Sequence, residues 1–189
     1  MAPRHDSVAP SLLLAMPQLQ DPNFARSVVL LCEYSPDGAM GFVVNRPTGL
    51  RAAEAVSLDP PPQGDSGLEL WTGGPVETHR GFLLLGSEPP TDASERIADG
   101  FHLTASLDVL RSLIETSPAE LASRQCRLLL GYAGWGPGQL DAELAASSWL
   151  LAPADPRLVF ETEPESMWEH AIRGLGVDPM ALAPAPGTQ

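Results

Sequence analysis

The sequence predicts an α+β protein, and three observations carry this prediction. Short apolar runs rich in β-branched residues, bounded by proline and glycine turns, concentrate in the first half of the chain. Amphipathic helical patterns are interspersed among them without the regular strand–helix rhythm of a doubly wound parallel sheet. The chain has 189 residues, of which 43% are hydrophobic, enough for one sizeable core.

The most clearly defined element is an antiparallel hairpin. Residues 27–34 form a mostly apolar, β-branched run, and residues 41–45 form a second one. Between them lies Ser35-Pro36-Asp37-Gly38, in which proline presets the first turn dihedral and glycine closes the turn. The first strand lacks polar alternation, which predicts burial on both of its faces.

The remaining elements follow from periodicity and capping signals. Further strands are predicted at residues 12–16, 68–71, 81–85, 127–132 and 158–161. Helices are predicted at residues 106–116, with Leu107, Leu110, Leu113 and Ile114 on one stripe, then from Ser117-Pro118, at 139–147 and at 165–173, ending at Gly174. Proline-rich residues 59–67 and 88–92 are predicted loops.

Charge excludes several classes of function. The chain has 11 basic and 24 acidic residues, a net charge of -13, and every basic residue is arginine. Without lysine there is no Schiff-base chemistry and no Walker-type phosphate loop. The excess of acid lies in residues 52–189, because residues 1–51 balance four arginines with four acids. Direct binding of nucleic acid is therefore disfavoured.

Catalytic and metal motifs are not recognisable in the sequence. Cys32 and Cys126 have no CxxC or histidine partner, and burial in the first hairpin strand predicts that Cys32 is inert. The histidines lack metal-ligand spacing. We expect no catalytic residue, metal or cofactor. The apolar run at residues 12–16 is too short for a signal peptide or membrane span, which favours a cytoplasmic protein.

Two glycine-rich segments are the candidates for ligand binding. Residues 130–140 leave a strand, pass four glycines and enter a helix, the geometry that cradles phosphate. Pro137 removes a donor there and no lysine follows, so close backbone packing is favoured over a ligand loop. Trp135, like Trp149 and Trp168, is expected to be a core anchor.

The second segment, residues 71–76, precedes Arg80, which either clamps an anion or pairs with one of the many carboxylates. The sequence does not say whether the two segments meet. If they do, the candidate ligand-binding residues are Asn45, Arg46, Gly73, Gly74 and Arg80 on one rim and Trp135 and Gln139 on the other. With lysine missing, Arg46 or Arg80 would hold any bound anion.

Several ordered blocks together resemble the AlgH/YqgE family of small bacterial proteins. They are Leu19-Gln20-Asp21-Pro22-Asn23-Phe24, the hairpin with Glu33 and Gly38-Ala39-Met40-Gly41, Gly73-Gly74-Pro75-Val76, and residues 131–140 with Glu143. The resemblance implies a single α+β domain in which a branched, largely antiparallel sheet curls toward a pseudo-barrel flanked by helices. Residues 1–11 are then a flexible N-terminus, 12–180 the domain and 181–189 a disordered tail.

The resemblance implies no established activity and no catalytic residues; the family is labelled a transcriptional regulator without any known DNA-binding motif. The residues favour a non-enzymatic binding or regulatory module whose partner is a protein or a small anionic ligand. The alternative is an enzyme or sensor that acts on a small anionic ligand in a glycine-loop pocket. Oligomeric state is not predicted.

Overall fold

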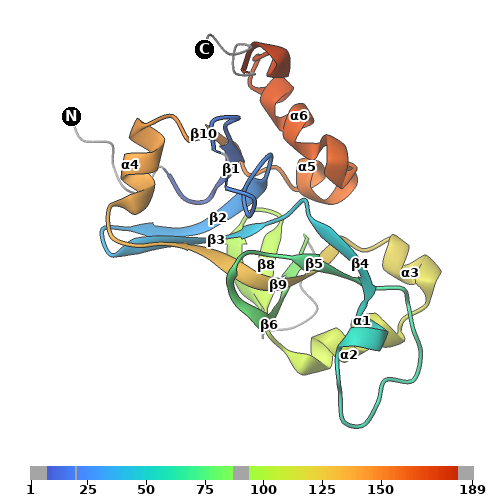
Figure 1. Ribbon diagram of the computed structural model, residues 1–189. Helices are drawn as coiled ribbons and strands as arrows, with labels where there is room; N and C mark the ends of the chain where they lie inside the picture. The colour runs from blue at the N-terminus through green and yellow to red at the C-terminus, as the bar shows by residue number, and fades with distance from the viewer. Residues whose placement is uncertain (1–7, 20, 87–93, 183–189) are drawn as a thin grey trace.

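The computed structural model describes residues 8–19, 21–86 and 94–182, and these form a mixed fold with a curled sheet and six α-helices (Figure 1). The strands are β1 (Ser11–Ala15), β2 (Val28–Ser35), β3 (Gly38–Val43), β4 (Pro47–Arg51), β5 (Glu69–Thr72), β6 (Val76–Leu85), β7 (Glu95–Ala98), β8 (Phe101–Thr104), β9 (Cys126–Trp135) and β10 (Trp149–Ala152). The helices are α1 (Ala52–Ala55), α2 (Leu107–Glu115), α3 (Pro118–Ala122), α4 (Gln139–Ala145), α5 (Pro156–Glu161) and α6 (Pro164–Gly174). The predicted α+β class is confirmed.

The sheet branches at its long central strand, β9. The main path runs β10-β1-β2-β3-β9-β6-β8-β7, and all of these pairs are antiparallel. β5 leaves this path: it pairs in parallel with residues 128–130 of β9, whereas β3 pairs with residues 133–135. β4 extends the branch by pairing with β5. The two arms give the sheet its half-barrel curl.

The hairpin is confirmed, and its first strand is buried on both faces as predicted. Val28 to Leu31 are inaccessible to solvent because successive side chains enter different apolar clusters. Val28 and Leu30 pack with α5 and α6, whereas Val29 and Leu31 pack toward α4 on the other face. Figure 1 shows these helices on opposite sides of the β1–β3 layer.

Helix α2 covers the other arm of the sheet. Leu110, Leu113 and Ile114 are buried there, as the predicted stripe requires. Leu107, assigned to the same stripe, is 65% exposed, and that assignment was wrong: Leu107 is the first helical residue, and Val109 fills the stripe instead. The predicted cap of α3 is confirmed, with Ser117 Oγ accepting the Glu120 N–H and Pro118 at the first helical position.

One predicted strand is a helix. Residues 158–161 lie in α5, because Asp155 Oδ1 caps the Arg157 N–H and Pro156 occupies the first turn, where its missing donor costs nothing. The apolar run Leu158-Val159-Phe160 is too short to distinguish the periodicity of a strand from that of a helix. β4, β7, β8 and β10 were not predicted, each having only four or five residues.

The chain ends are only partly described. β1 begins at Ser11, inside the segment expected to be flexible, and a 3₁₀ turn over Pro179–Leu182 extends into the expected tail. The predicted loop at residues 88–92 and most of the tail lie outside the described residues.

Candidate functional site

The two glycine-rich segments meet at the branch of the sheet. The Gly73 N–H donates to the Leu130 carbonyl at 2.7 Å, and the Gly73 carbonyl accepts the Val43 N–H at 2.7 Å. A Cβ at Gly73 would overlap the Gly131 carbonyl, and one at Gly74 would overlap the backbone of Tyr132. The contact is therefore backbone against backbone, which is what three strands converging on β9 require.

Asn45 and Arg46 hold the preceding loop, residues 21–26, against the end of β3. Asn45 accepts the Val28 N–H and donates to the Arg26 carbonyl, at 3.0 and 3.1 Å. The Arg46 guanidinium donates to the carbonyls of Pro22, Asn23 and Ala25. Burial lowers the pKa of Arg46, and these carbonyls take three of its five N–H donors.

Trp135 and Gln139, on the other predicted rim, converge on Glu143. One oxygen of its carboxylate accepts the indole N–H groups of Trp135 at 2.9 Å and Trp149 at 2.8 Å, and the other accepts the Gln139 amide at 3.1 Å. Phe24 packs on both indoles, with ring centroids 6.4 and 5.6 Å away. Both tryptophans are buried, so they are core anchors as expected.

The two rims are thus joined through the loop of residues 21–26, whose backbone contacts Arg46 and whose Phe24 contacts Trp135. Arg80 stands apart from this network. It lies 3.4 Å from Glu77 and stacks on the Phe82 ring at 5.0 Å, on an exposed bulge opposite Gly131. The structure brings the glycines, Asn45 and Arg46 together and leaves Arg80 in solvent.

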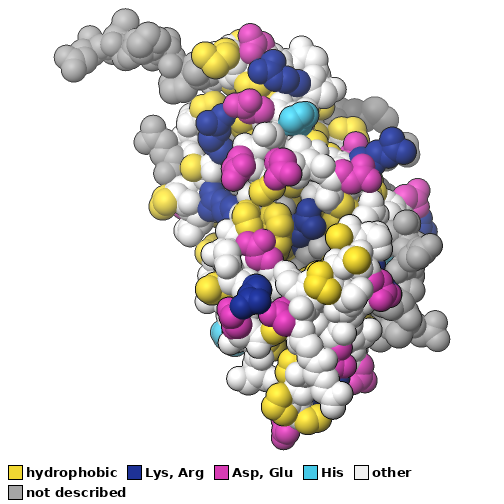
Figure 2. Space-filling model, turned by 90° about the vertical axis from the view of Figure 1, so that its right-hand side faces the viewer, with side chains coloured by type: hydrophobic (Ala, Val, Ile, Leu, Met, Phe, Trp, Pro, Cys, Tyr) yellow, Lys and Arg dark blue, Asp and Glu magenta, His cyan; other side chains and the backbone are white. Residues whose placement is uncertain are grey.

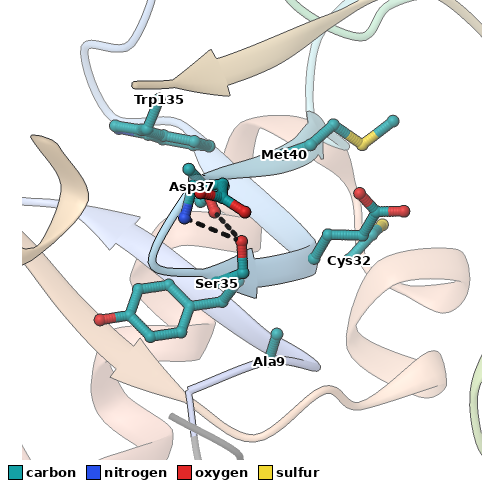
Figure 3. A pocket seen from close by; sticks show the side chains of 10 residues that line it. Ala9, Cys32, Ser35, Asp37, Met40 and Trp135 are labelled. Carbon is teal, nitrogen blue, oxygen red and sulfur yellow. Dashed lines mark hydrogen bonds between the residues drawn. The ribbon is translucent and has the colours of Figure 1, made fainter. Parts of the chain in front are cut away.

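The larger pocket lies beside the hairpin turn and has a volume of about 740 Å³. It is lined by Ala9, Trp135 and most of the hairpin between Cys32 and Met40. Figure 3 shows the turn in this pocket, where Ser35 Oγ accepts the Asp37 N–H at 3.2 Å. Glu33 and Asp37 are the charged lining residues, so the pocket repels anions.

Cys32 also lines this pocket, and its chemistry follows from its surroundings. Burial, with smaller contributions from Glu33 and Glu95, raises the pKa of the Cys32 thiol to about 12. The thiol is therefore protonated at neutral pH, in agreement with the inert cysteine predicted from the sequence.

A second pocket of about 310 Å³ surrounds Arg127, which sequence reasoning missed. The guanidinium lies between two rings, with its carbon 4.4 Å from the centroid of Trp71 and 5.6 Å from that of Phe160. Burial lowers the pKa of Arg127. The available signal was the position of Arg127 at the start of the apolar run Leu128-Leu129-Leu130, because arginine is rarely buried in a strand unless its charge has a partner.

Other charges are interspersed. On the face shown in Figure 2, acidic side chains separate the arginines from one another. Among residues 8–19, 21–86 and 94–182, no three His, Cys, Asp or Glu side chains are placed to hold a metal ion. The part of the chain that the structure describes also contains no helix long and apolar enough to cross a membrane.

Comparison with known proteins decides the family. The sequence profile described as AlgH-like matches residues 12–180. The chain belongs to the AlgH-like family. A UPF0301 protein of Afipia carboxidovorans is 43% identical over 180 residues, covering 88% of this chain and 83% of the relative. One from Ruegeria pomeroyi is 40% identical over 181 residues, covering 93% and 96%. The family resemblance stated from the sequence is confirmed.

Solved structures agree with this AlgH-like assignment. The solution structure of the AlgH protein from Pseudomonas aeruginosa superposes with a TM-score of 0.73 at 36% identity and covers 100% of both chains. A crystal structure of a protein from Corynebacterium diphtheriae has a TM-score of 0.69 at 21% identity, covering 97% of this chain and 95% of that one, and shows the shared fold.

Proposed function

We propose that this AlgH-like protein is a non-enzymatic binding module of the cytoplasm that receives a protein partner in the hairpin pocket. The observation that carries the proposal is the pocket itself: about 740 Å³, next to a rigid tryptophan cluster, with Glu33 and Asp37 as its charged lining residues. Such a pocket suits a basic or neutral segment of a protein better than an anion. A regulatory role would then act through a protein rather than through DNA.

The rest of the predicted site supports this pocket from behind. Trp135 lines it, Gln139 and Glu143 fix Trp135, and Arg46 holds the loop whose Phe24 packs on the same indole. Preorganised aromatic side chains bind at low entropic cost. Asn45, Gly73 and Gly74 would fix the strands that carry these groups, and Arg80 as an anion clamp stays a prediction.

The test is comparative capture of partners from the native host. The double variant Glu33→Gln/Asp37→Asn removes the pocket carboxylates from exposed positions, and Asp108→Asn/Glu165→Gln removes the same charge from exposed helix starts elsewhere. We expect a protein that the parent and the control retain and the pocket variant loses. A photo-crosslinker at residue 37, but not at residue 108, should join to the same protein. Equal retention by both variants would contradict the proposal.

A small-ligand sensor is the alternative function, and one observation favours it. Arg127 presents a guanidinium to a pocket without a carboxylate within ion-pair distance among the described residues. Native mass spectrometry of the protein purified from its own host separates the two functions, because it reports a retained small molecule and an associated protein as different mass increments.

A further inference from the structure

We propose that the pocket around Arg127 binds a small zwitterion, a molecule with a carboxylate and an ammonium group a few bonds apart, as in a free α-amino acid. The inference rests on the small-ligand alternative above and is independent of the hairpin pocket. It follows from the donors of Arg127, the aromatic walls and the carboxylates at the rim.

Two of the five N–H donors of the Arg127 guanidinium have no hydrogen-bond acceptor among the described residues. A guanidinium carries five N–H donors, and the protein accepts three hydrogen bonds from it: to the carbonyl of Cys126 at 3.0 Å, Val159 at 3.3 Å and Phe160 at 3.2 Å. Its Nε is buried without a hydrogen-bond partner among the described residues. The carbonyls fix the guanidinium in place without cancelling its charge, and they leave one Nη1 hydrogen unused, so an anion that reaches it gains a charge-assisted hydrogen bond.

The walls of the pocket include two aromatic rings and two prolines. Trp71 and Phe160 stack on the guanidinium and hold its plane, and Pro47 and Pro164 complete the apolar lining. Trp135, Trp149 and Trp168 all donate their indole N–H within the protein. Trp71, which lines the pocket, makes no such hydrogen bond with another described residue.

The carboxylates at the rim of the pocket favour a ligand that also has a positively charged group. Three carboxylates line the pocket beside one cation: Glu69, which accepts the Gly49 N–H at 2.8 Å, and Glu161 and Glu163. Glu161 and Glu163 are exposed and make no ion pair in the described part of the chain. A phosphate dianion would meet more repulsion than attraction here. A ligand with an ammonium group next to its carboxylate would pair the carboxylate with Arg127 and the ammonium with the glutamates.

Size agrees with this ligand class. A volume of about 310 Å³ lies at the lower end of small-molecule sites, which span roughly 300–1,000 Å³. A single amino acid fits such a volume, whereas a nucleotide would fill or exceed it. The pocket thus combines a carboxylate site on the Arg127 side with an ammonium site on the Glu161 and Glu163 side.

The experiment is a titration of the full chain with free L-amino acids, followed by the indole N–H resonance of Trp71 in NMR spectra. For each amino acid that binds, the N-acetyl derivative removes the ammonium charge and the amide removes the carboxylate. Because each loses a charged partner, we expect each derivative to bind at least about tenfold more weakly. Equal binding of all three forms, or no shift with any amino acid at millimolar concentration, would overturn the proposal.

Variants separate the two halves of the site. Arg127→Gln should abolish binding of the amino acid. Since Arg127 also connects β9 to α5, Glu161→Gln/Glu163→Gln provides a second variant on exposed side chains. It should weaken binding of the amino acid about tenfold and should not weaken binding of the N-acetyl derivative, which has no ammonium group to lose a partner. Glu33→Gln/Asp37→Asn, in the hairpin pocket, should bind the amino acid like the parent. An unchanged affinity in the Glu161/Glu163 variant would refute the ammonium site.

Discussion

Gly73 shows how a single residue type decides whether the sheet can branch. Its α-carbon faces the carbonyl of Gly131, and Gly74 and Gly131 take φ angles of +155° and +74°, which L side chains rarely adopt. The sequence pattern indicated close packing over a ligand loop, and the geometry of these three glycines agrees. The pattern did not reveal that the two segments pack on each other, because that contact joins strands far apart in the chain.

Replacing Gly73 by alanine tests this reading. The new Cβ would overlap backbone, which cannot move without opening the branch, so we expect Gly73→Ala to lower the free energy of unfolding by about 2–3 kcal/mol. Gly136→Ala is the control, because a Cβ there would lie 3.9 Å from the Gln139 side-chain oxygen, at ordinary van der Waals distance. Urea denaturation of both variants measures the difference. Equal midpoints would show that the branch tolerates a side chain.

Cys32 gives a residue-scale prediction about reactivity. With its pKa raised by burial to about 12, the folded protein should react with iodoacetamide at pH 8 at least about a hundredfold more slowly than glutathione, and unfolding in urea should remove the difference. Mass spectrometry of the labelled peptide measures the rate.

The same shift affects stability at alkaline pH. The folded pKa lies above the unfolded value of 9.0, so the contribution of Cys32 is complete below pH 9 and is lost as the pH rises toward 12. Cys32→Ala should therefore lose less stability than the parent over that interval. Rapid labelling of the folded protein at pH 8 would contradict both expectations.

Local sequence signals do not show which arginine lines a pocket, and the reason is physical. Arg46 and Arg80 were chosen because they flank turns, where side chains emerge. Arg46 instead donates to three loop carbonyls and lines neither of the two pockets, whereas Arg127, inside a strand, also donates to three carbonyls but lines a pocket. Whether an arginine lines a pocket depends on which segments surround it, and for Arg127 that is fixed by tertiary contacts between β9 and α5.

Among the helices and strands, the sequence predicted those that have a local turn, periodicity or capping signal. The hairpin has a turn signature, α2 has an apolar stripe and α3 has a capping serine, so all three were found. Residues 158–161 were misassigned because a four-residue apolar run fits either period, and the Asp155-Pro156 cap outweighed it. β4, whose residues are all exposed, has no hydrophobic alternation that would predict a strand. It forms because it pairs with the edge of β5.

The two serine caps should differ in their effect on stability. Ser106 Oγ accepts the Val109 N–H at 3.3 Å and begins α2, which buries four apolar side chains, whereas α3 buries none. Ser106→Ala should therefore cost about 1 kcal/mol, the usual effect of losing a cap. Ser117→Ala should cost less than about 0.5 kcal/mol, since fraying of α3 would release only the half-buried Leu121 from the core. Thermal unfolding of the two variants compares them, and a larger loss for Ser117→Ala would contradict the argument.

For the molecule as a whole, the comparisons confirmed the family and the structure confirmed the fold class. The curl and branching of the sheet were implied by the family resemblance and not by periodicity, because both arise from three strands sharing β9. The charge pattern was read correctly from composition, but its arrangement needed the structure. In the part of the chain that the structure describes, six arginines form ion pairs with carboxylates, and Arg46 and Arg127 face carbonyls.

This arrangement predicts that the protein does not bind duplex DNA directly. A net charge of -13 repels phosphates, and eight of the 11 arginines already contact carboxylates or backbone carbonyls. Gel-shift assays at low salt should show no retained duplex at micromolar protein, with random sequence or with DNA from the native host. A basic DNA-binding domain on the same gel is the control. Sequence-specific retention at nanomolar protein would contradict the prediction and restore a direct role in transcription.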